Sequence, residues 1–333
     1  MRAIQITETG GPEVLRLAEL PDPEPGPGQL LVEVAAAGVN YLDTYYRSGA
    51  YPIPLPFIPG SEGAGTVTAI GPGVGTVAVG DRVAWATSLG SYAELALVPA
   101  DQAVPVPAGI DIEIAAGCLL QGMTAHYLAV SVHPVRSGET VLVHAAAGGM
   151  GLLLTQLASA RGARVIGTVS TAEKERLARA AGAAEVIRYT EIGDLAGEVR
   201  RLSDGRGVAA VYDGVGAATF DASLASLRPR GMLALYGGAS GPVPPVDPQR
   251  LNSAGSVFLT RPKLADYIAT REELGWRAGE VFDAIRDGSL RITVSGRYPL
   301  ADAARAHQDL QGRRTTGKLL LLPAGTSRPR GAG

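Results

Sequence analysis

The 333-residue chain has one cysteine, Cys118, and only three lysines. A single cysteine excludes an intramolecular disulfide and a cysteine-rich zinc site. No run of about 18 apolar residues is present to span a bilayer. The N-terminus lacks the apolar core of a signal peptide, so we expect a cytoplasmic protein. The 30 basic and 32 acidic residues nearly cancel, which argues against nucleic acid or an anionic membrane as a partner.

Residues 141–171 carry the most informative pattern. An apolar strand (141–143) runs into small residues, and a long apolar helix pattern (150–161) follows. Ala146, Gly148 and Gly151 have the dinucleotide-binding Gly-x-Gly-x-x-Gly spacing, with Ala in place of the first Gly. Small residues let the backbone approach a pyrophosphate, which sits on the unpaired N–H groups of the helix. The sequence predicts a nucleotide-binding turn.

The chain divides into two kinds of pattern. Residues 1–123 are β-rich and interrupted by Gly and Pro, whereas strands and helices alternate from about residue 124. Such alternation builds a parallel sheet with helices on both faces. Residues 290–322 return to short strands around one helix, and we expect residues 290–333 to pack on the first region. The predicted nucleotide domain, 124–289, is therefore an insertion between residues 1–123 and 290–333. Within it, strands are expected at 141–143, 164–169, 185–189, 208–212, 232–236 and 257–260, and helices at 150–161, 172–181, 194–202, 217–227 and 271–287.

Several short motifs occur in a fixed order along residues 1–322. They are Pro-Glu-Val-Leu at 12–15, Gly-Val-Asn-Tyr-Leu-Asp-Thr at 38–44, Tyr-Arg-Ser-Gly at 46–49, Pro-Gly-Ser-Glu at 59–62, the Gly-rich turn at 145–151, Val-Tyr-Asp-Gly-Val-Gly at 211–216, Thr-Arg-Pro at 260–262 and Thr-Gly-Lys at 316–318. Together they resemble the quinone oxidoreductase (zeta-crystallin-like) branch of the medium-chain dehydrogenase/reductases. The resemblance implies an α/β protein with a GroES-like β-rich catalytic domain, an inserted Rossmann-type doubly wound parallel sheet, NADPH as reductant and a homodimer.

Zinc-dependent relatives of this family place Cys where this chain has Asn40 and His where it has Ser61. Neither Asn nor Ser is a customary zinc ligand, and the four histidines do not cluster in the sequence. We therefore expect no metal. Without a Lewis acid to polarise an alcohol, an acceptor that is already electrophilic, such as a quinone, is favoured over alcohol oxidation.

The cofactor preference depends on the end of the second strand. NAD-specific folds place Asp or Glu there to hold the ribose 2′-hydroxyl. This chain has Ser170 and Thr171, and Lys174 follows within one helical turn. Hydroxyls and an ammonium group favour the 2′-phosphate of NADPH, and the resemblance places Tyr189 near this phosphate. Alternatively, Lys174 is a solvated helix residue and Ser170 only an N-cap.

The resemblance places Asn40, Asp43, Tyr45, Tyr51 and Thr124 in the acceptor pocket. A carboxamide and a phenol hydrogen-bond quinone oxygens, and Tyr also stacks on the ring. Tyr45 and Tyr51 are candidate proton donors, with water as the alternative source. Either Tyr alternatively fills space under a Pro-rich loop, and Asp43 is more suited to fixing the loop backbone than to titrating.

Further positions match cofactor contacts of the family. Arg261 alternatively lies at the surface, at the edge of a dimer. The predicted cofactor set, beyond Ser170, Thr171, Lys174 and Tyr189, is Tyr41, Thr44, Gly148, Gly149, Met150, Gly151, Gly214, Tyr236, Gly237, Gly238, Ala239, Leu259, Thr260, Arg261, Gly317 and Lys318.

This chain departs from the family at Gln121, where Lys is frequent, and at Gly214, where Ser is common. The first change removes a charge, and the second removes a hydroxyl while keeping Asp213. We expect an NADPH-dependent quinone reductase that passes reducing equivalents as a hydride or in one-electron steps. The alternatives are reduction of an activated alkene (an enone or enoyl thioester) and a non-enzymatic protein that binds NADPH or RNA.

Overall fold

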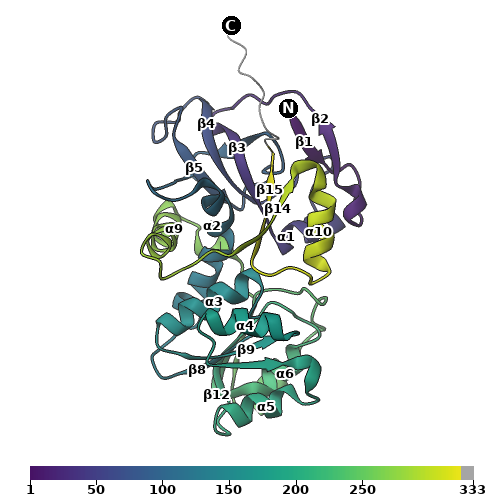
Figure 1. Ribbon diagram of the computed structural model, residues 1–333, viewed down its shortest axis with the longest axis vertical. Helices are drawn as coiled ribbons and strands as arrows, with labels where there is room; N and C mark the ends of the chain where they lie inside the picture. Colours follow the sequence, from purple (N-terminus) through teal and green to yellow (C-terminus); the bar gives the residue numbers. More distant parts are fainter. Residues whose placement is uncertain (324–333) are drawn as a thin grey trace. The chain divides into compact units, whose positions relative to one another are not determined.

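The computed structural model describes residues 1–323 and contains two compact units (Figure 1). Unit 1 comprises Met1–Leu120, Thr270–Phe282 and residues 292–323, and unit 2 comprises Gln121–Ala269 and Asp283–Arg291; residues 324–333, which the sequence predicts in the first domain, lie outside the described residues. Residues 270–282 thus group with unit 1, whereas the sequence prediction had assigned them to the nucleotide domain. None of the helices in the described range is long and apolar enough to cross a bilayer.

Unit 2 contains a parallel sheet with the strand order β10-β9-β8-β11-β12-β13. This is the doubly wound order, in which ligands bind outside the carboxyl ends of the strands where the order reverses, here between β8 and β11. Helices α3 and α4 lie on one face of the sheet and α5 and α6 on the other (Figure 1). The elements are β8 (Thr140–Val143), α3 (Gly149–Ala160), β9 (Arg164–Val169), α4 (Ala172–Ala180), β10 (Glu185–Arg188), η3 (Tyr189–Glu191), α5 (Leu195–Leu202), β11 (Val208–Asp213), α6 (Phe220–Ser226), β12 (Leu227–Leu235), α7 (Gln249–Ser253), β13 (Phe258–Thr260) and α8 (Leu264–Tyr267).

The central strand β11 shows why the sequence forms this sheet. All six of its residues are buried, as expected of a parallel strand that is covered on both faces. Most predicted bounds in unit 2 differ from the structure by at most one residue, and two differ by more. The helix predicted at 217–227 begins only at Phe220, because residues 214–219 form a turn around the Asp213 carboxylate. The strand predicted at 232–236 begins earlier, at Leu227.

Unit 1 is built on a mainly antiparallel sheet with the order β14-β15-β3-β4-β5-β7, and β6 pairs with β3. The long strand β3 pairs with three other strands, and its side chains Leu30 and Val32 belong to the same buried apolar cluster as Trp85 of β5. The elements are β1 (Arg2–Gln5), η1 (Pro12–Val14), β2 (Arg16–Glu19), β3 (Gln29–Val39), α1 (Tyr41–Ser48), β4 (Glu62–Ile70), β5 (Arg82–Ala86), β6 (Leu95–Pro99), β7 (Val104–Pro105), β14 (Val294–Pro299), η4 (Leu300–Asp302), α10 (Ala303–Gln311) and β15 (Lys318–Leu322).

Two helices run from one unit into the other. α2 (Ile112–Tyr127) continues into a π-helical turn (Leu128–Val132). α9 (Arg271–Arg286) starts in unit 1 and ends in unit 2. The residues predicted for the acceptor site are divided between the two units. Thr124 lies on the part of α2 that belongs to unit 2, and the others belong to unit 1: Asn40, Asp43, Tyr45 and Tyr51.

Candidate active site

The carboxyl ends of the unit 2 strands carry nearly all the cofactor residues predicted for this unit. They lie after β8, β9, β10, β11 and β12 and at the end of β13, so the topology gathers segments from across the chain at the carboxyl ends of the strands. By strand, the residues are Gly148, Gly149, Met150 and Gly151; Ser170, Thr171 and Lys174; Tyr189; Gly214; Tyr236, Gly237, Gly238 and Ala239; and Leu259, Thr260 and Arg261.

The Gly-rich turn between β8 and α3 is tightly closed. Ala145 has the left-handed φ of 50°, and its carbonyl accepts a hydrogen bond from Gly148 N at 2.8 Å. Gly148 is the N-cap of α3. A Cβ on Gly151 would lie 2.2 Å from Ala145 O and 2.6 Å from Ala146 Cα, so only Gly fits there. The first N–H groups of α3 lack intrahelical partners, which makes this turn a fit for a pyrophosphate.

Gln121 lies directly beside this turn. A Cβ on Gly149 would be 2.3 Å from Gln121 Oε1, so the carboxamide covers the Gly149 backbone. The departure from the family's Lys therefore places a neutral amide, instead of a charge, against the first turn of α3.

The loop after β9 has the composition predicted for a 2′-phosphate. Thr171 is the N-cap of α4, and its Oγ1 accepts from Lys174 N at 3.2 Å. Thr190 Oγ1 donates to Ser170 O at 3.2 Å, which ties the turn containing Tyr189 to this loop. Tyr189 is exposed. Thr171, rather than Ser170, is therefore the capping residue, and the side chains of Lys174 and Tyr189 belong to adjoining segments.

The ends of β11, β12 and β13 pack closely. A Cβ on Gly214 would lie 2.7 Å from the Tyr236 ring, and one on Gly237 would lie 2.4 Å from Gly214 O. The Tyr236 ring thus occupies the space of a side chain at position 214. Ala239 N donates to Gly214 O at 3.2 Å, and Arg261 Nη1 donates to Leu235 O at 3.0 Å. Arg261 therefore joins the ends of β12 and β13.

In unit 1, Asn40 precedes α1 and is held by a buried ion pair. Lys318 Nζ donates to Asn40 Oδ1 at 2.8 Å and to Glu62 Oε2 at 2.5 Å. Asn40 Nδ2 in turn donates to Glu62 Oε2 at 2.9 Å. Lys318 is 2 % exposed and Glu62 is 0 % exposed. Because the ammonium and the carboxylate contact opposite ends of the carboxamide, they fix its orientation.

Asp43 ends a chain of buried polar groups that begins at Arg47. The Arg47 guanidinium can only donate, so His307 Nδ1 accepts from Nη1 at 3.2 Å. His307 Nε2–H then donates to Tyr92 Oη at 3.0 Å, and the Tyr92 hydroxyl donates to Asp43 Oδ2 at 3.1 Å. Burial raises the pKa of Asp43 to about 6 and lowers the pKa of His307 to about 3. We name these four residues the unit 1 chain.

Asp43 also fixes the backbone around it. Its carboxylate accepts from Asn40 N at 2.9 Å, Ser61 N at 3.1 Å and Ser61 Oγ at 2.8 Å. With the Tyr92 hydroxyl, four donors surround this fully buried side chain. These contacts support the interpretation that Asp43 holds the loop backbone.

The tyrosines of α1 form an aromatic cluster with Tyr51, which lies just beyond the helix. The rings of Tyr41 and Tyr45 lie 5.7 Å apart, and those of Tyr45 and Tyr51 lie 5.2 Å apart. Burial raises the pKa of Tyr41 above its ordinary value. Tyr51 is 43 % exposed, and Thr44 Oγ1 donates to Tyr41 O at 2.6 Å. The Tyr51 side chain is therefore accessible to a ligand, whereas the Thr44 hydroxyl is already hydrogen-bonded to the helix backbone.

The remaining predicted residue of unit 1, Gly317, directly precedes the buried Lys318. It has a φ of 60°, and a Cβ there would lie 2.2 Å from Thr293 O, so the position requires Gly. Lys318 N donates to this same Thr293 carbonyl at 2.7 Å. Gly317 thus lets the chain turn closely so that Lys318 enters the core.

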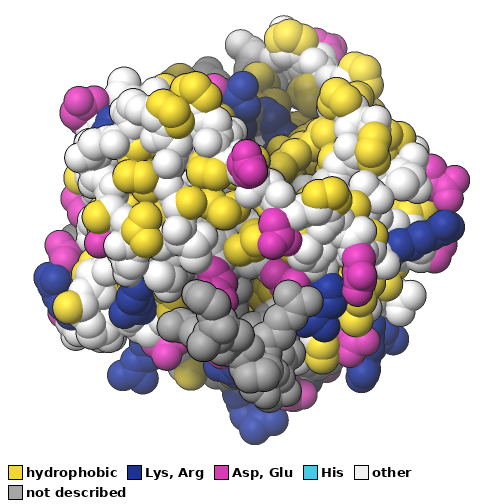
Figure 2. Space-filling view, turned by 90° about the horizontal axis from the view of Figure 1, so that it is seen from above, with side chains coloured by type: hydrophobic (Ala, Val, Ile, Leu, Met, Phe, Trp, Pro, Cys, Tyr) yellow, Lys and Arg dark blue, Asp and Glu magenta, His cyan; other side chains and the backbone are white. Residues whose placement is uncertain are grey.

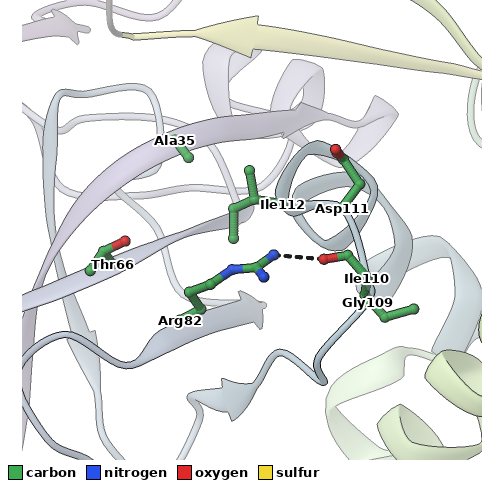
Figure 3. Close-up of a pocket in the computed structure, with 7 residues that line it drawn as sticks. All are labelled: Ala35, Thr66, Arg82, Gly109, Ile110, Asp111 and Ile112. Atoms are coloured by element: carbon green, nitrogen blue, oxygen red, sulfur yellow. Dashed lines mark hydrogen bonds between the residues drawn. The ribbon is translucent and has the colours of Figure 1, made fainter.

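A pocket on unit 1 lies apart from these residues (Figure 3). It is lined by parts of β3, β4 and β5 and the start of α2, and Arg82 Nη2 donates to Ile110 O at 2.6 Å across it. None of the predicted site residues lines this pocket. On the face drawn in Figure 2, acidic and basic side chains are interspersed.

Asn40 and Ser61, which stand where zinc-dependent relatives have metal ligands, make other hydrogen bonds in this chain. Asn40 binds the Lys318 ammonium and Glu62, and Ser61 Oγ donates to Asp43. A buried ammonium ion beside Asn40 supplies a positive charge of its own, and an amide and a hydroxyl are poor zinc ligands. These residues do not fit zinc.

Two family descriptions match the chain. Residues 26–108 match the alcohol dehydrogenase GroES-like domain, and residues 149–270 match the zinc-binding dehydrogenase family. The architecture is thus that of a medium-chain dehydrogenase/reductase, with a GroES-like unit and a Rossmann-type unit.

Full-length relatives narrow the assignment. The chain is 48 % identical to a quinone oxidoreductase of Pseudomonas aeruginosa over 97 % of this chain and 99 % of the relative. The solved structure of Escherichia coli quinone oxidoreductase complexed with NADPH is 43 % identical, with a TM-score of 0.95 over 97 % of this chain and 100 % of that one. A mycobacterial structure complexed with NADPH is 59 % identical, with a TM-score of 0.94 and the same coverage. The chain belongs to the quinone oxidoreductase family of the medium-chain dehydrogenase/reductases.

Several buried polar residues were not singled out from the sequence. They are Arg47, Glu62, Tyr92 and His307 in unit 1, and His144, Thr168 and Ser223 in unit 2. One signal was present, because His144 follows an apolar strand and directly precedes the small residues of the turn. The partners of these residues lie far away in the sequence, so their grouping required the fold.

Proposed function

We propose that the protein is an NADPH-dependent quinone reductase that works without a metal ion. The observation that carries this proposal is the pairing of a tightly closed Gly-rich turn at α3 with an acid-free Ser170-Thr171 loop and Lys174 at the neighbouring strand end. Two of the similar solved structures were obtained with NADPH, and the similar full-length relatives are named quinone oxidoreductases. When bound, NADPH supplies the reducing equivalents.

The residues of this chain bind and orient the reactants. The N–H groups at the start of α3 hold the pyrophosphate, and Ser170, Thr171, Lys174 and Tyr189 hold the 2′-phosphate. In unit 1, the phenols of Tyr41, Tyr45 and Tyr51 offer hydrogen bonds and ring stacking to a planar acceptor. Burial raises the Tyr41 pKa, so this phenol stays protonated at neutral pH and donates. Reduction of an electrophilic quinone requires orientation more than a dedicated base.

Reduction of an activated alkene is a second candidate function. A 2-haloacrylate reductase from a Burkholderia species is 43 % identical over 96 % of this chain and 98 % of the relative. Its named substrate carries an electron-poor carbon–carbon double bond. The same phenols serve as hydrogen-bond donors to the carbonyl of such a substrate.

We further propose that the enzyme is a cytoplasmic homodimer. Phe258 lies on β13, the edge strand of the unit 2 sheet, and is 58 % exposed, and Arg261 directly follows this strand. An exposed apolar side chain on a sheet edge favours pairing with another chain. Sedimentation equilibrium tests this proposal, and a monomer at micromolar concentration contradicts it.

Oxidation of NADPH, followed at 340 nm, tests the function. We expect rapid bleaching with 1,4-benzoquinone and 9,10-phenanthrenequinone, and slower or no bleaching with enones and 2-haloacrylate. Pretreatment with a chelator should leave the rate unchanged. Turnover of the alkenes alone favours the second function, and no turnover with any acceptor rejects both.

A further inference from the structure

A second chain of buried polar groups lies in unit 2, where the strand order reverses. His144 follows β8, Thr168 lies in β9, Asp213 ends β11 and Ser223 lies in α6. None of the four is more than 2 % exposed. His144 Nδ1 lies 3.0 Å from Thr168 Oγ1, and its Nε2 lies 2.9 Å from Ser223 Oγ. Ser223 Oγ is 2.7 Å from Asp213 Oδ2, and Ala145 N is 3.3 Å from Thr168 Oγ1.

The direction of every hydrogen bond in this group follows from its two ends, the Ala145 N–H and the Asp213 carboxylate. Asp213 accepts from Val215 N and Gly216 N, which can only donate, so its carboxylate is the acceptor end. Ser223 has one hydroxyl hydrogen and gives it to Asp213. Its oxygen therefore accepts from His144 Nε2–H.

At the other end, the neutral His144 ring has an unprotonated Nδ1 that accepts the hydroxyl hydrogen of Thr168. The Thr168 oxygen is then left to accept from Ala145 N–H. Burial lowers the pKa of His144, in agreement with a neutral ring. The bonds run in one direction, from Ala145 through Thr168, His144 and Ser223 to Asp213.

Ala145 is the residue through which this chain reaches the cofactor turn. It has a φ of 50°, a left-handed conformation that is unfavourable for residues other than Gly and costs about 1 kcal/mol for such a residue. The Ala145 carbonyl accepts from Gly148 N and lies against Gly151. A bond that fixes Ala145 N therefore also fixes the start of α3.

We propose that Thr168, His144, Ser223 and Asp213 are positioning residues that hold the Gly-rich turn in its anion-binding conformation, with His144 kept as the neutral Nε2–H form. This proposal rests on the proposed NADPH function. The four residues contact one another and the turn backbone, and they act on the cofactor only through Ala145.

Matched substitutions at Thr168 provide the test. Thr168→Val keeps the shape and removes the hydroxyl, whereas Thr168→Ser keeps the hydroxyl. Thr155, on α3, is fully buried, and its Oγ1 has no hydrogen-bond partner among residues 1–323, so Thr155→Val is the control for loss of a buried hydroxyl. Calorimetry with NADPH should show a dissociation constant about 5- to 10-fold higher for Thr168→Val, the loss expected for one hydrogen bond.

We expect Thr168→Ser and Thr155→Val to bind NADPH within about 2-fold of the wild type. The quinone KM of Thr168→Val at saturating NADPH should stay unchanged, because the proposal confines the effect of Thr168 to the turn that binds the cofactor. Wild-type affinity in Thr168→Val, or an equal loss in Thr155→Val, overturns the proposal.

Nitrogen NMR of the cofactor-free wild type tests the chain independently of any activity or variant stability. The spectrum should show His144 protonated at Nε2 alone and neutral at pH 7, with the signal assigned by its loss in His144→Gln. An Nδ1–H tautomer or a charged ring contradicts the proposal. If the wild type shows the expected tautomer but no NADPH binding, the proposed function fails while the hydrogen-bond chain stands.

Discussion

In each unit a buried histidine is hydrogen-bonded within a chain of polar groups that ends next to a segment of the proposed site, but the chemistry of the two chains differs. In unit 1, His307 connects Arg47 to Asp43 through Tyr92, so a cation and an anion stand at the ends. In unit 2, His144 connects a backbone N–H to Asp213, whose other donors are backbone amides and hydroxyls. The chain of hydrogen bonds in unit 1 therefore starts at a buried cation, whereas the chain in unit 2 consists of neutral hydrogen-bond donors that lead to the Asp213 carboxylate. The difference predicts that pH and charge substitutions affect unit 1 most.

Removing the buried charge at Lys318 should have the largest effect on stability. Lys318→Met leaves the Glu62 carboxylate buried without its counter-ion and should lower the free energy of unfolding by about 3–5 kcal/mol. The control is Lys263→Met, because Lys263 and its partner Asp266 are exposed, and we expect a loss below about 0.5 kcal/mol. Urea unfolding measures both. Adding Glu62→Gln to Lys318→Met should recover part of the loss, and an equal effect of the two Lys variants contradicts the account.

The unit 1 chain predicts opposite pH profiles for two variants. The pKa of Asp43 is raised from 3.8 to about 6, so its stabilising contribution is complete below pH 3.8 and is lost as the pH rises through 6. The pKa of His307 is lowered from 6.5 to about 3, so stability is lost as the pH falls below 6.5. Each effect amounts to about 2 kcal/mol between about pH 6 and 4, because one pKa unit corresponds to about 1.4 kcal/mol.

Relative to the wild type, His307→Gln should therefore gain stability as the pH falls from 6.5 to about 4. Asp43→Asn should lose stability over the same range, because it lacks the proton uptake of Asp43. Chemical unfolding at several pH values measures the two differences. Parallel profiles for the two variants would show that the charged ends of the unit 1 chain do not govern its energetics.

In unit 2, two glycines of the same turn should respond differently to alanine. A Cβ on Gly151 meets backbone atoms, whereas a Cβ on Gly149 meets the end of the flexible Gln121 side chain. Gly151→Ala should cost about 1–3 kcal/mol of stability and weaken NADPH binding, because the backbone must shift. Gly149→Ala should be nearly neutral in stability. Thermal unfolding and calorimetry distinguish them, and similar losses would refute the close helix–turn packing.

The smallest expected effect concerns the helix cap in the phosphate loop. Thr171→Ala removes the hydrogen bond that Lys174 N donates to Thr171 Oγ1 and should lower the free energy of unfolding by about 1 kcal/mol, whereas Thr171→Ser should retain stability. Asp194→Ala, which removes the N-cap of α5, should cost a similar amount but leave NADPH affinity unchanged. A drop in affinity for Asp194→Ala would show that cap loss alone perturbs the site.

The sequence predicted the unit 2 strands and helices well, because periodicity and glycine placement are local signals. The predicted start of the helix at 217 was wrong, because the Asp213 carboxylate accepts hydrogen bonds from Val215 N and Gly216 N and the helix begins only after this turn. Such a contact has no signal in the hydrophobic periodicity. The predicted start of the strand at 232 was also wrong, because the strand begins at Leu227. The fold class and the family were confirmed, whereas the individual site residues remain predictions. The burial of Lys318 against Glu62 was not foreseen, because the two residues are 256 positions apart.

Calorimetric titration of the wild type and Lys174→Ala with NADPH and with NADH tests the central claim most directly. We expect the wild type to bind NADPH at least about 10-fold more tightly than NADH, since an ammonium and hydroxyls receive the 2′-phosphate. Lys174→Ala should lose most of that preference by weakening NADPH binding alone. Equal or tighter binding of NADH by the wild type would contradict the account.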